Sequence, residues 1–563
     1  MSQHPLARLK RYDIESITRY YRFRPWLVFA RAVLIVWKFA GFLLGLRADR
    51  GHTNPIRRRQ RAVQLRHILT DLGPTYIKVG QALSTRPDLV HKDFLEELTR
   101  LQDQLPPFPN DIAFAIIEQE LERSVSEVYQ TISADPVAAA SLGQVYKATL
   151  HTGEEVAVKV QRPNLLPTLT LDLHLMRWAA SWLGPHLPLN LGHDLLLIVD
   201  EFGTKLFEEI DYLNEGRNAE RFAAYFKGDV SVKVPSIYWR HSSRHVLTLE
   251  WINGIKLTDV ERVQAAGLDI SELVRIGVSS GLRQLLEFGF FHADPHPGNL
   301  FATLDGKMAY IDFGMMDQLE QHDKEILIDA VVYAVNKDYD HLTQAFVELG
   351  FLAAGTDIQP IVPAIESVLG NVMGESVADF NIKTVTDKFS ELMFEYPFRV
   401  PGRFALIIRS VVTQEGVALS LDPNFRILEV AYPYVARRLL SDESPELRRR
   451  LLEVLFKDGR FQWQRLENLI QIAQIDAGFD LMPTAQLGLQ YLLSEEGQFL
   501  RRKLLLALTE DDRLHTDEVR RIWNLVKGEI KPDRLWGAAL GALATVWPSA
   551  TALVTAFTPS EQL

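Results

Sequence analysis

The sequence of 563 residues contains no cysteine. This absence excludes disulfides, cysteine nucleophiles and thiolate metal sites, and it is compatible with a reducing compartment. The chain also has no low-complexity tract and no repeat of fixed period, so nothing indicates a repeat architecture. Hydrophobic residues make up 47% and charged residues 24% of the chain, which is typical of a folded globular protein. Because 563 residues exceed one ordinary hydrophobic core, we expect several domains.

Acidic residues are scarce in the first 66 positions. This segment contains 15 Lys and Arg residues but only three acids, Asp13, Glu15 and Asp49, so its net charge is +12. The whole chain has a net charge of −11, and the remaining residues therefore carry −23. A basic arm on an acidic body predicts an anionic partner surface. Nucleic acid is one candidate, but the arm contains the apolar run Pro25–Leu46, and we therefore expect a membrane surface and no nucleic acid.

Charges interrupt this apolar run at a regular spacing. Arg24, Arg31 and Lys38 recur every seven residues, so on a helix they form one polar stripe opposite a broad apolar face, as an interfacial helix requires. The alternative is a helix packed on its own protein. A cleaved signal peptide does not fit, because the run starts late, carries internal charges and lacks a small-residue cleavage pattern.

The other end of the chain has an apolar run with no charged residue, Leu535–Phe557. Its length reaches the ~20 residues that a membrane helix needs, but it is rich in Ala and Thr and contains Pro548. We interpret it as a membrane-associating or hairpin segment, with a buried terminal helix as the alternative. Whether it also mediates a homodimer stays open.

Periodicity gives a coarse secondary structure. Residues 67–109 have a helical pattern broken by Gly73 and Pro74, and residues 110–130 have a second one. Alternating β-branched residues around the turn 151–153 predict two antiparallel strands within 141–160. Residues 194–227 return to helix, 246–251 form a short apolar strand, and the remainder is mostly helical.

Phosphoryl transfer needs a carboxylate base and oxygen ligands for magnesium, and the segment 291–314 supplies both. Asp294 precedes Asn299 by five residues, and an apolar strand then leads to the triplet Asp312-Phe313-Gly314. This order and spacing match the catalytic loop and the metal-binding Asp-Phe-Gly of protein kinases. Asp294 is thus predicted as the catalytic base, and Asn299 and Asp312 as magnesium ligands.

Two histidines in the same segment, His292 and His296, are four residues apart and raise the question of zinc. The Asp-Pro and Pro-Gly pairs around them do not suit a helix, and the His-Glu-x-x-His pattern is absent. We expect these histidines to shape the loop.

Lys159 lies in the strand sequence Val156-Ala157-Val158-Lys159, where a kinase keeps the lysine that binds the α- and β-phosphates. The following helical stretch offers five acidic candidates as its partner. They are Glu208, Glu209, Asp211, Glu215 and Glu220, of which Asp211 and Glu215 share a face. Leu249–Ile252 is a candidate hinge, at which the backbone of Glu250 and Ile252 would meet adenine.

Together these features resemble the AarF/UbiB family of atypical kinases, whose members accompany ubiquinone and other prenylquinone biosynthesis. The resemblance runs from about residue 68 to about residue 314. Besides the kinase residues, it rests on three motifs: Lys78-Val79-Gly80-Gln81, the alanine-rich loop 138–144, and Glu209-Ile210-Asp211. It implies that ATP and Mg²⁺ are cofactors, that Glu215 is the partner of Lys159, and that Lys78, Gly80, Gln81, Glu209 and Asp211 are regulatory.

The alanine-rich loop stands where a kinase has glycines that let backbone N–H groups approach phosphate. Ala138, Ala139 and Ala140 restrict that approach, and Gly143 is the one flexible point that remains. We expect altered or weakened phosphate binding by the set Ala138, Ala139, Ala140, Ser141, Gly143 and Gln144. The resemblance implies that this loop and the Lys-x-Gly-Gln helices restrain phosphoryl transfer and cover the position of a protein substrate. No Ala-Pro-Glu follows Gly314, so a peptide-docking platform is missing.

The predicted fold class is α+β, a bilobal protein-kinase-like fold with a small β-rich N-lobe and a helical C-lobe. We predict five segments: a membrane-associating arm (1–66), a helical Lys-x-Gly-Gln extension (67–125), the N-lobe with a helical insert (126–255), the C-lobe (256–460) and a helical tail (461–563).

The predicted function is a membrane-associated atypical kinase or ATPase that supports prenylquinone biosynthesis or lipid homeostasis, on the cytoplasmic side or in an equivalent reducing compartment. Prenylquinone or phenolic isoprenoid lipid precursors are candidate partners. One alternative is a nucleotide-gated lipid-binding module with little chemistry. Another is a small-molecule kinase of the aminoglycoside or choline kinase type, although those kinases lack the Lys-x-Gly-Gln module. An ordinary Ser/Thr kinase is disfavoured by the missing Ala-Pro-Glu.

Overall fold

A computed structural model describes most of residues 9–49, 55–84, 90–101, 107–183, 195–373 and 398–435, short stretches of 455–470, and 516–526. The chain divides into two compact units. The first comprises Met1–Glu320, Phe346–Val372 and Asn381–Phe425, and the second comprises Gln321–Ala345, Met373–Phe380 and Arg426–Leu563. The predicted apolar segment 535–557 lies outside the described residues.

The N-lobe is built on an antiparallel sheet of order β1-β3-β4-β6, with β2 paired to β3. Its strands are β1 (Tyr129–Ile132), β2 (Ala138–Ala139), β3 (Gly143–Leu150), β4 (Glu155–Gln161) and β6 (Val246–Glu250). Strands β3 and β4 form the predicted hairpin, in which Val145 lies opposite Lys159. Because side chains alternate along a strand, Val145 and Lys159 share one face of the sheet, and Gln144 and Val160 share the other.

Each face of this sheet packs against a helix. On one face, α6 (Asn110–Leu121) contributes Ala113 and Ile117 to a core that contains Tyr146 and Val158. The other face meets α10 (Tyr212–Tyr225). The predicted helix at 110–130 is interrupted, because Glu122 ends α6 in a left-handed conformation at φ 54°. A short helix, α7 (Val125–Val128), then leads into β1.

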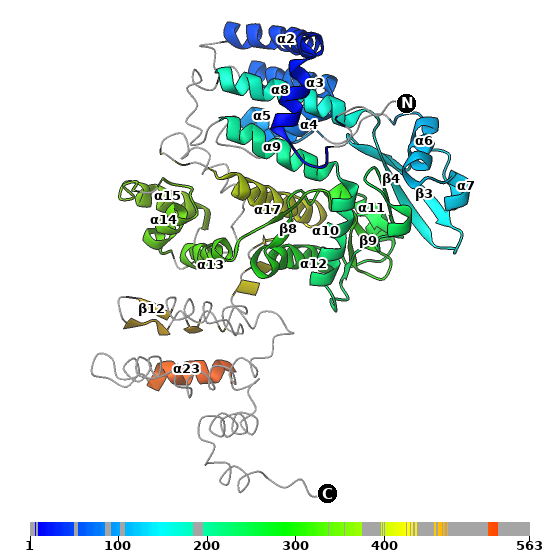
Figure 1. Cartoon of the computed structure of the whole chain (residues 1–563). Coiled ribbons are helices and arrows are strands. Elements are labelled where there is room, and N and C mark those ends of the chain that lie inside the picture. Colours follow the sequence, from blue (N-terminus) through cyan, green and yellow to red (C-terminus); the bar gives the residue numbers. More distant parts are fainter. Residues whose placement is uncertain are drawn as a thin grey trace, which may run out of the picture. The chain divides into compact units, whose positions relative to one another are not determined.

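The C-lobe of the first unit combines helices with two small sheets. One sheet has the order β5-β10-β9-β7, and β8 pairs with β11. The strands are β5 (Val232–Lys233), β7 (Gly254–Lys256), β8 (Phe290–His292), β9 (Leu300–Thr303), β10 (Met308–Tyr310) and β11 (Met316–Gln318). The helices are α11 (Val260–Ala265), α12 (Ile270–Leu282), η4 (Arg283–Phe288), η5 (Pro297–Asn299), α15 (Ile361–Met373) and α17 (Gly402–Leu421). The short helix η3 (Trp239–His241) packs on β6 of the N-lobe sheet. Helices α12 and α17 of the C-lobe pack together (Figure 1).

A group of helices adjoins the N-lobe (Figure 1). Its members are α1 (Ile14–Arg22), α2 (Pro25–Ala48), α3 (Pro55–Leu72), α4 (Pro74–Leu83), α5 (Lys92–Leu98), α8 (Leu165–Leu183) and α9 (Leu195–Glu209). Helices α8 and α9 are the insert between Lys159 and Glu215. Helix α3 runs through residue 66 without a break, so the proposed boundary between arm and extension falls inside an element.

The second unit contains α13 (Gln321–Val335) and most of α14 (Tyr339–Glu348). It also holds a two-stranded ladder of β12 (Phe456–Lys457) with β13 (Arg460–Phe461), and the helix α23 (Thr516–Val526).

Helix α2 has its charged stripe against the protein and its apolar face outward. Arg31 forms a bidentate pair with the buried Asp172 of α8, at 2.8 and 3.0 Å, and also donates to the Leu72 carbonyl at 2.7 Å. Lys38 contacts Asp71 at 2.7 Å. The outward face exposes Trp26, Phe29, Val33, Val36, Trp37, Leu43 and Leu44. The predicted stripe therefore exists, but it pairs with the protein's own carboxylates.

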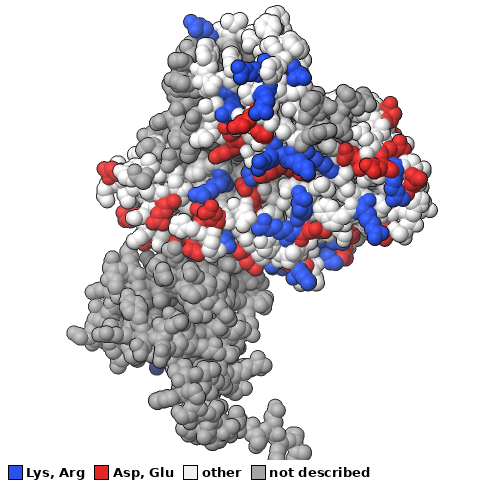
Figure 2. All heavy atoms as spheres, viewed as in Figure 1, with Lys and Arg blue, Asp and Glu red and all other residues white. Residues whose placement is uncertain are grey.

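Two described helices are long and apolar enough to cross a membrane, namely α2 and α17. Helix α17 packs against α12 and buries Phe404, Ile407 and Ala418, so it belongs to the C-lobe core. Helix α2 is different, because most of its surface is exposed and apolar. In the view of Figure 2, the region where α2 lies in Figure 1 carries uncoloured and basic side chains.

Candidate active site

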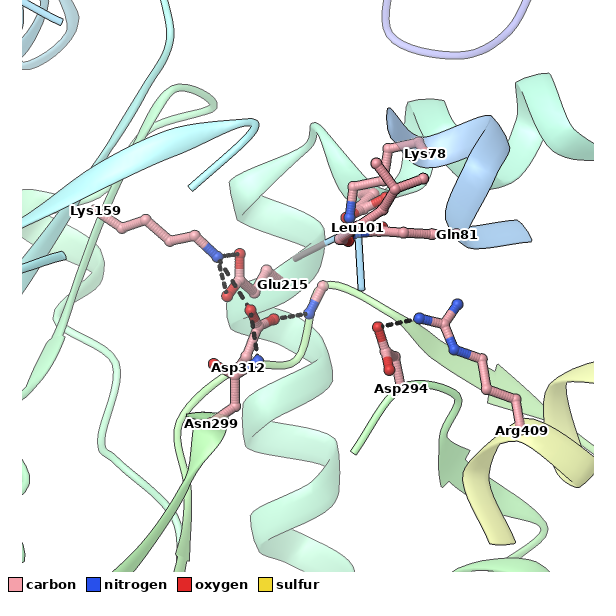
Figure 3. Close-up of polar contacts among 11 residues, drawn as sticks. Lys78, Gln81, Leu101, Lys159, Glu215, Asp294, Asn299, Asp312 and Arg409 are labelled. Carbon is pink, nitrogen blue, oxygen red and sulfur yellow. Dashed lines mark hydrogen bonds and ion pairs between the residues drawn. The ribbon is translucent and has the colours of Figure 1, made fainter. Parts of the chain in front are cut away.

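Lys159 and Glu215 form the lysine–glutamate ion pair expected of a kinase. Lys159 on β4 places its Nζ 2.8 Å from both carboxylate oxygens of Glu215 on α10. The same Nζ lies 3.8 Å from Asp312 Oδ2 (Figure 3). Of the five acidic candidates, only Glu215 contacts Lys159 among the described residues, while Asp211 caps α10 by accepting the N–H of Leu213 at 3.1 Å.

Burial and charge act in opposite directions on this pair. Burial alone would lower the pKa of Lys159, but the carboxylates of Asp312 and Glu215 outweigh it and raise that pKa well above its usual value. Burial raises the pKa of Glu215 to about 7, against the opposing charge of Lys159. Lys159 therefore keeps its positive charge, and Glu215 is the member of the pair that titrates near neutrality.

Asn299 at the end of η5, directly before β9, faces Asp312, which follows β10. Asn299 Nδ2 lies 3.4 Å from Asp312 Oδ2, and the Gly314 N–H donates to Asp312 Oδ1 at 2.9 Å. Burial would raise the pKa of Asp312, but the charge of Lys159 and the Gly314 N–H lower it, so the carboxylate is ionised.

These two side chains fit a magnesium ion held jointly with nucleotide phosphates. Within the described residues, no three His, Asp or Glu side chains gather to hold a metal alone. Mg²⁺ commonly takes one or two protein oxygens and completes its shell with phosphate and water oxygens. Asp312 and Asn299 can supply such a pair of oxygens.

Asp294 lies in the loop between β8 and η5, and two histidines fix the shape of that loop. The Asp294 N–H donates to His292 Nδ1 at 3.1 Å, and the Gly298 N–H donates to His296 Nδ1 at 3.1 Å. Burial lowers the pKa of His292, which keeps the ring neutral and able to accept. Both histidines thus have the loop-shaping role expected from the sequence.

Asp294 also has a partner that sequence reasoning missed. Arg409 on α17 donates from Nη2 to Asp294 Oδ2 at 2.5 Å (Figure 3). The two side chains are only 13% and 20% exposed, so the pair is shielded from water. Arg409 lies 115 residues after Asp294 in a helix with no recognisable motif, and no local signal could have identified it.

The alanine-rich loop is a tight hairpin. Ala138 and Ala139 pair with Val145 and Gln144, and the Ala140 N–H donates to the Gly143 carbonyl at 2.8 Å. Arg162 donates to the Ala140 carbonyl at 3.1 Å.

The tip of this hairpin, Ser141-Leu142, is buried. Leu142 inserts into a cluster with Ile17 of α1, Leu169 of α8 and Phe207 of α9. Helices α1, α8 and α9 therefore fix the tip of the alanine-rich loop in place.

Glycine is required at position 143 because neighbouring atoms approach its backbone closely, and not because the backbone needs a conformation that favours glycine. Its φ lies outside the left-handed region. A Cβ at this position would lie 2.4 Å from the Tyr212 hydroxyl oxygen and 2.5 Å from the Val160 carbonyl oxygen, which is too close for any side chain. The sequence predicted Gly143 as the flexible point of the loop, whereas the structure needs glycine there for lack of space.

Gln144 faces away from Lys159, on the other side of the sheet. Its amide accepts the Phe108 N–H at 3.0 Å and donates to the Phe108 carbonyl at 3.2 Å. At the hinge, the Glu250 carboxylate pairs with Lys233 at 2.7 Å and accepts the Ser236 N–H at 3.1 Å. The side chains of Gln144 and Glu250 are thus engaged with other parts of the protein, and contact of the Glu250 and Ile252 backbone with adenine stays a prediction.

The Lys-x-Gly-Gln motif forms helix α4. Lys78 is buried and forms an ion pair with Glu209 at the end of α9. Gln81 donates to the Leu101 carbonyl at 2.8 Å, and Gly80 leaves room for Leu101, which a Cβ would meet at 2.1 Å. In Figure 3, α4 lies across from Asp294 and Arg409.

The two-lobed fold, the Lys159–Glu215 pair and the Asp294, Asn299 and Asp312 loops together define a protein-kinase-like domain. Residues 100–346 match the model of the ABC1 atypical kinase-like domain. The chain is 66% identical to the protein slr1919 of Synechocystis sp., over 97% of this chain and 98% of that protein. It is 50% identical to the protein ACTIVITY OF BC1 COMPLEX KINASE 1, chloroplastic, of Arabidopsis thaliana, over 84% of this chain and 71% of that protein. The chain therefore belongs to the ABC1 atypical kinase-like family.

Among solved structures, the chain is similar to that of the Rv3197–erythromycin complex from Mycobacterium tuberculosis. The TM-score is 0.45, with 26% identity, and the match covers 63% of this chain and 92% of that one.

Proposed function

We propose that this protein is a membrane-associated, Mg-ATP-dependent atypical kinase or ATPase that supports prenylquinone biosynthesis or lipid homeostasis. The observation that carries this proposal is Lys159 Nζ at 2.8 Å from both oxygens of Glu215 and 3.8 Å from Asp312. This is the arrangement that phosphoryl transfer needs to bind and orient the phosphates.

Each residue has a role in this proposal. Lys159, held by Glu215, binds the phosphates, and Asp312 and Asn299 hold Mg²⁺, which neutralises charge on the phosphates when bound. Asp294 accepts the proton of the attacking hydroxyl or water. The Lys78–Glu209 pair and the buried tip Leu142 hold α4 and the alanine-rich loop over the site, which supports restrained transfer and no large peptide substrate.

Membrane association is supported by the outward apolar face of α2. A Trp-rich helix face with its charges turned inward would be unstable in water but suits the interfacial region of a bilayer. Because the Arg31–Asp172 pair ties α2 to α8, we propose that α2 lies along the membrane surface and does not cross it. Two relatives in Arabidopsis thaliana are named chloroplastic, and a chloroplast or a bacterial cell offers the reducing compartment that the proposal requires.

A nucleotide-gated lipid-binding module is the second candidate. It is favoured by Arg409, which occupies the Asp294 carboxylate that a transfer reaction would need as a base.

The test is equilibrium binding of ATP by calorimetry, with and without Mg²⁺, to wild type, Lys159→Met and Asp312→Asn. Binding that needs Lys159 and loses its Mg²⁺ dependence in Asp312→Asn supports the proposal. Binding that neither variant changes would overturn it, because the nucleotide would then lie elsewhere.

A further inference from the structure

The hydroxyl of Tyr212 is buried without a hydrogen-bond partner among the described residues. Tyr212 is the first residue of α10 and its side chain is 1% exposed. Other buried tyrosines differ: Tyr129 bonds Thr248 at 3.0 Å, and Tyr310 bonds Ser280 at 2.5 Å. A buried hydroxyl without a partner costs free energy, so its retention in place of a plain phenyl ring requires a reason.

The Tyr212 side chain lies beside both Lys159 and the alanine-rich loop. The Lys159 Nζ is 5.0 Å from the centre of the Tyr212 ring. The hydroxyl oxygen reaches to within 2.4 Å of the position that a Gly143 Cβ would occupy, directly under the alanine-rich loop. It therefore lies between the lysine that binds phosphate in kinases and the loop that covers phosphate.

Packing explains the ring of Tyr212 but not its oxygen. The ring contacts a small apolar cluster with Ala157, Leu247 and Leu249. A phenylalanine would make the same apolar contacts. Burial, with the charges of Glu215 and Asp312, raises the pKa of Tyr212 despite the nearby Lys159, so the oxygen keeps its proton. The hydroxyl is thus a fixed hydrogen-bond donor that lacks an acceptor within the described part of the chain.

We propose that the Tyr212 hydroxyl donates to a phosphate oxygen of the bound nucleotide. It would replace part of the donor set that a glycine-rich loop supplies through its backbone and that Ala138–Ala140 restrict. This inference rests on nucleotide binding as proposed above, and it names a residue beside the family motifs. The signal in the sequence is only its position, directly after Glu209-Ile210-Asp211.

The arrangement also links phosphate entry to movement of the loop. Gly143 lies against the hydroxyl, and the hairpin tip Leu142 lies in the cluster formed by α1, α8 and α9. A phosphate oxygen reaches Tyr212 only when the hairpin shifts outward. The new hydrogen bond then offsets part of the cost of withdrawing Leu142 from its apolar surroundings.

The test compares Tyr212→Phe with Tyr129→Phe in the full-length protein. Tyr129 is equally buried but its hydroxyl is already bonded, so it is a matched control. Two quantities are measured for each variant: the dissociation constants for Mg-ATP and for adenosine, and the thermal unfolding midpoint without nucleotide.

We expect Tyr212→Phe to weaken Mg-ATP binding by about 10-fold or more, because one hydrogen bond to a charged group is lost. Adenosine binding by this variant should be unchanged, because adenosine has no phosphate. Its midpoint without nucleotide should equal or exceed that of wild type, because no native hydrogen bond is lost. Tyr129→Phe should show the reverse pattern, with a lower midpoint and unchanged Mg-ATP binding.

Three results would overturn the inference while leaving nucleotide binding intact. They are unchanged Mg-ATP affinity in Tyr212→Phe, an equal loss of ATP and adenosine binding, and a midpoint that falls as far as in Tyr129→Phe. The last would mean that the hydroxyl has a partner within the protein or a fixed water. Wild-type protein that binds no Mg-ATP would instead refute the proposed function itself.

Discussion

Arg409 Nη2 lies 2.5 Å from Asp294 Oδ2, so the carboxylate predicted to act as catalytic base is already engaged by a cation. The guanidinium occupies one of the two carboxylate oxygens that could accept a substrate proton. The site thus combines an assembled Lys159–Glu215 pair with a restrained base.

Arg409→Gln is expected to raise phosphate release from Mg-ATP several-fold, because it frees Asp294. Arg403→Gln, at an exposed position of the same helix, is the matched control and should behave as wild type. Initial rates under saturating Mg-ATP measure the effect. A rate at or below that of wild type would mean that Arg409 positions Asp294 and does not restrain it.

The buried Lys78 and the largely shielded Glu209, which is 13% exposed, form an ion pair that holds α4 to α9. Replacing Lys78 with Met leaves the Glu209 carboxylate without its cation and should lower the free energy of unfolding by about 3 kcal/mol. The double variant with Glu209→Gln should recover most of that loss. Chemical denaturation of wild type, both single variants and the double variant measures the coupling, and additive single losses would contradict a direct pair.

Glu215 should make stability depend on pH. Its pKa is raised from 4.5 to about 7 in the folded protein, so between these values folding takes up a proton. This contribution to stability is complete below pH 4.5 and is lost as the pH rises through about 7. Glu215→Gln has no such titration. The difference in unfolding midpoint, wild type minus variant, should therefore decrease from pH 5 to pH 8. A difference that stays constant would contradict the raised pKa of Glu215.

The outward face of α2 should bind lipid. Trp37→Glu, at a side chain 78% exposed, should weaken binding to anionic vesicles at least several-fold without lowering the unfolding midpoint. Trp178→Glu on α8 is the control, because Trp178 is also exposed. Met176 is the residue of α8 that packs toward α2, and Trp178 lies about 200° around the helix from it. Vesicle co-sedimentation distinguishes them, and equal losses in both variants would argue against α2 as the specific contact.

The fold and the core of the site could be predicted because their signals are local in the sequence. The spacing of Asp294, Asn299 and Asp312 and the strand around Lys159 follow from chemistry that tolerates little variation. The β3–β4 hairpin follows from alternation around a turn. Glu215 needed the family resemblance, because periodicity alone could not separate it from Asp211.

The remaining features depend on tertiary contacts that no local pattern records. Arg409 reaches Asp294 from 115 residues away. The seven-residue spacing of Arg31 and Lys38 predicted a stripe but not that Asp172 and Asp71 would turn it inward. Gly143 could be interpreted as a flexible point until the Tyr212 hydroxyl was located beside it.

The most direct test of the central claim, that this site transfers phosphoryl groups at a membrane, is phosphate release from Mg-ATP by purified protein. Wild type is compared with Asp312→Asn, with and without anionic liposomes. We predict release that rises with liposomes and is absent from the variant. Nucleotide binding without release above that of Asp312→Asn, in either condition, would contradict the enzyme and favour the nucleotide-gated binding module.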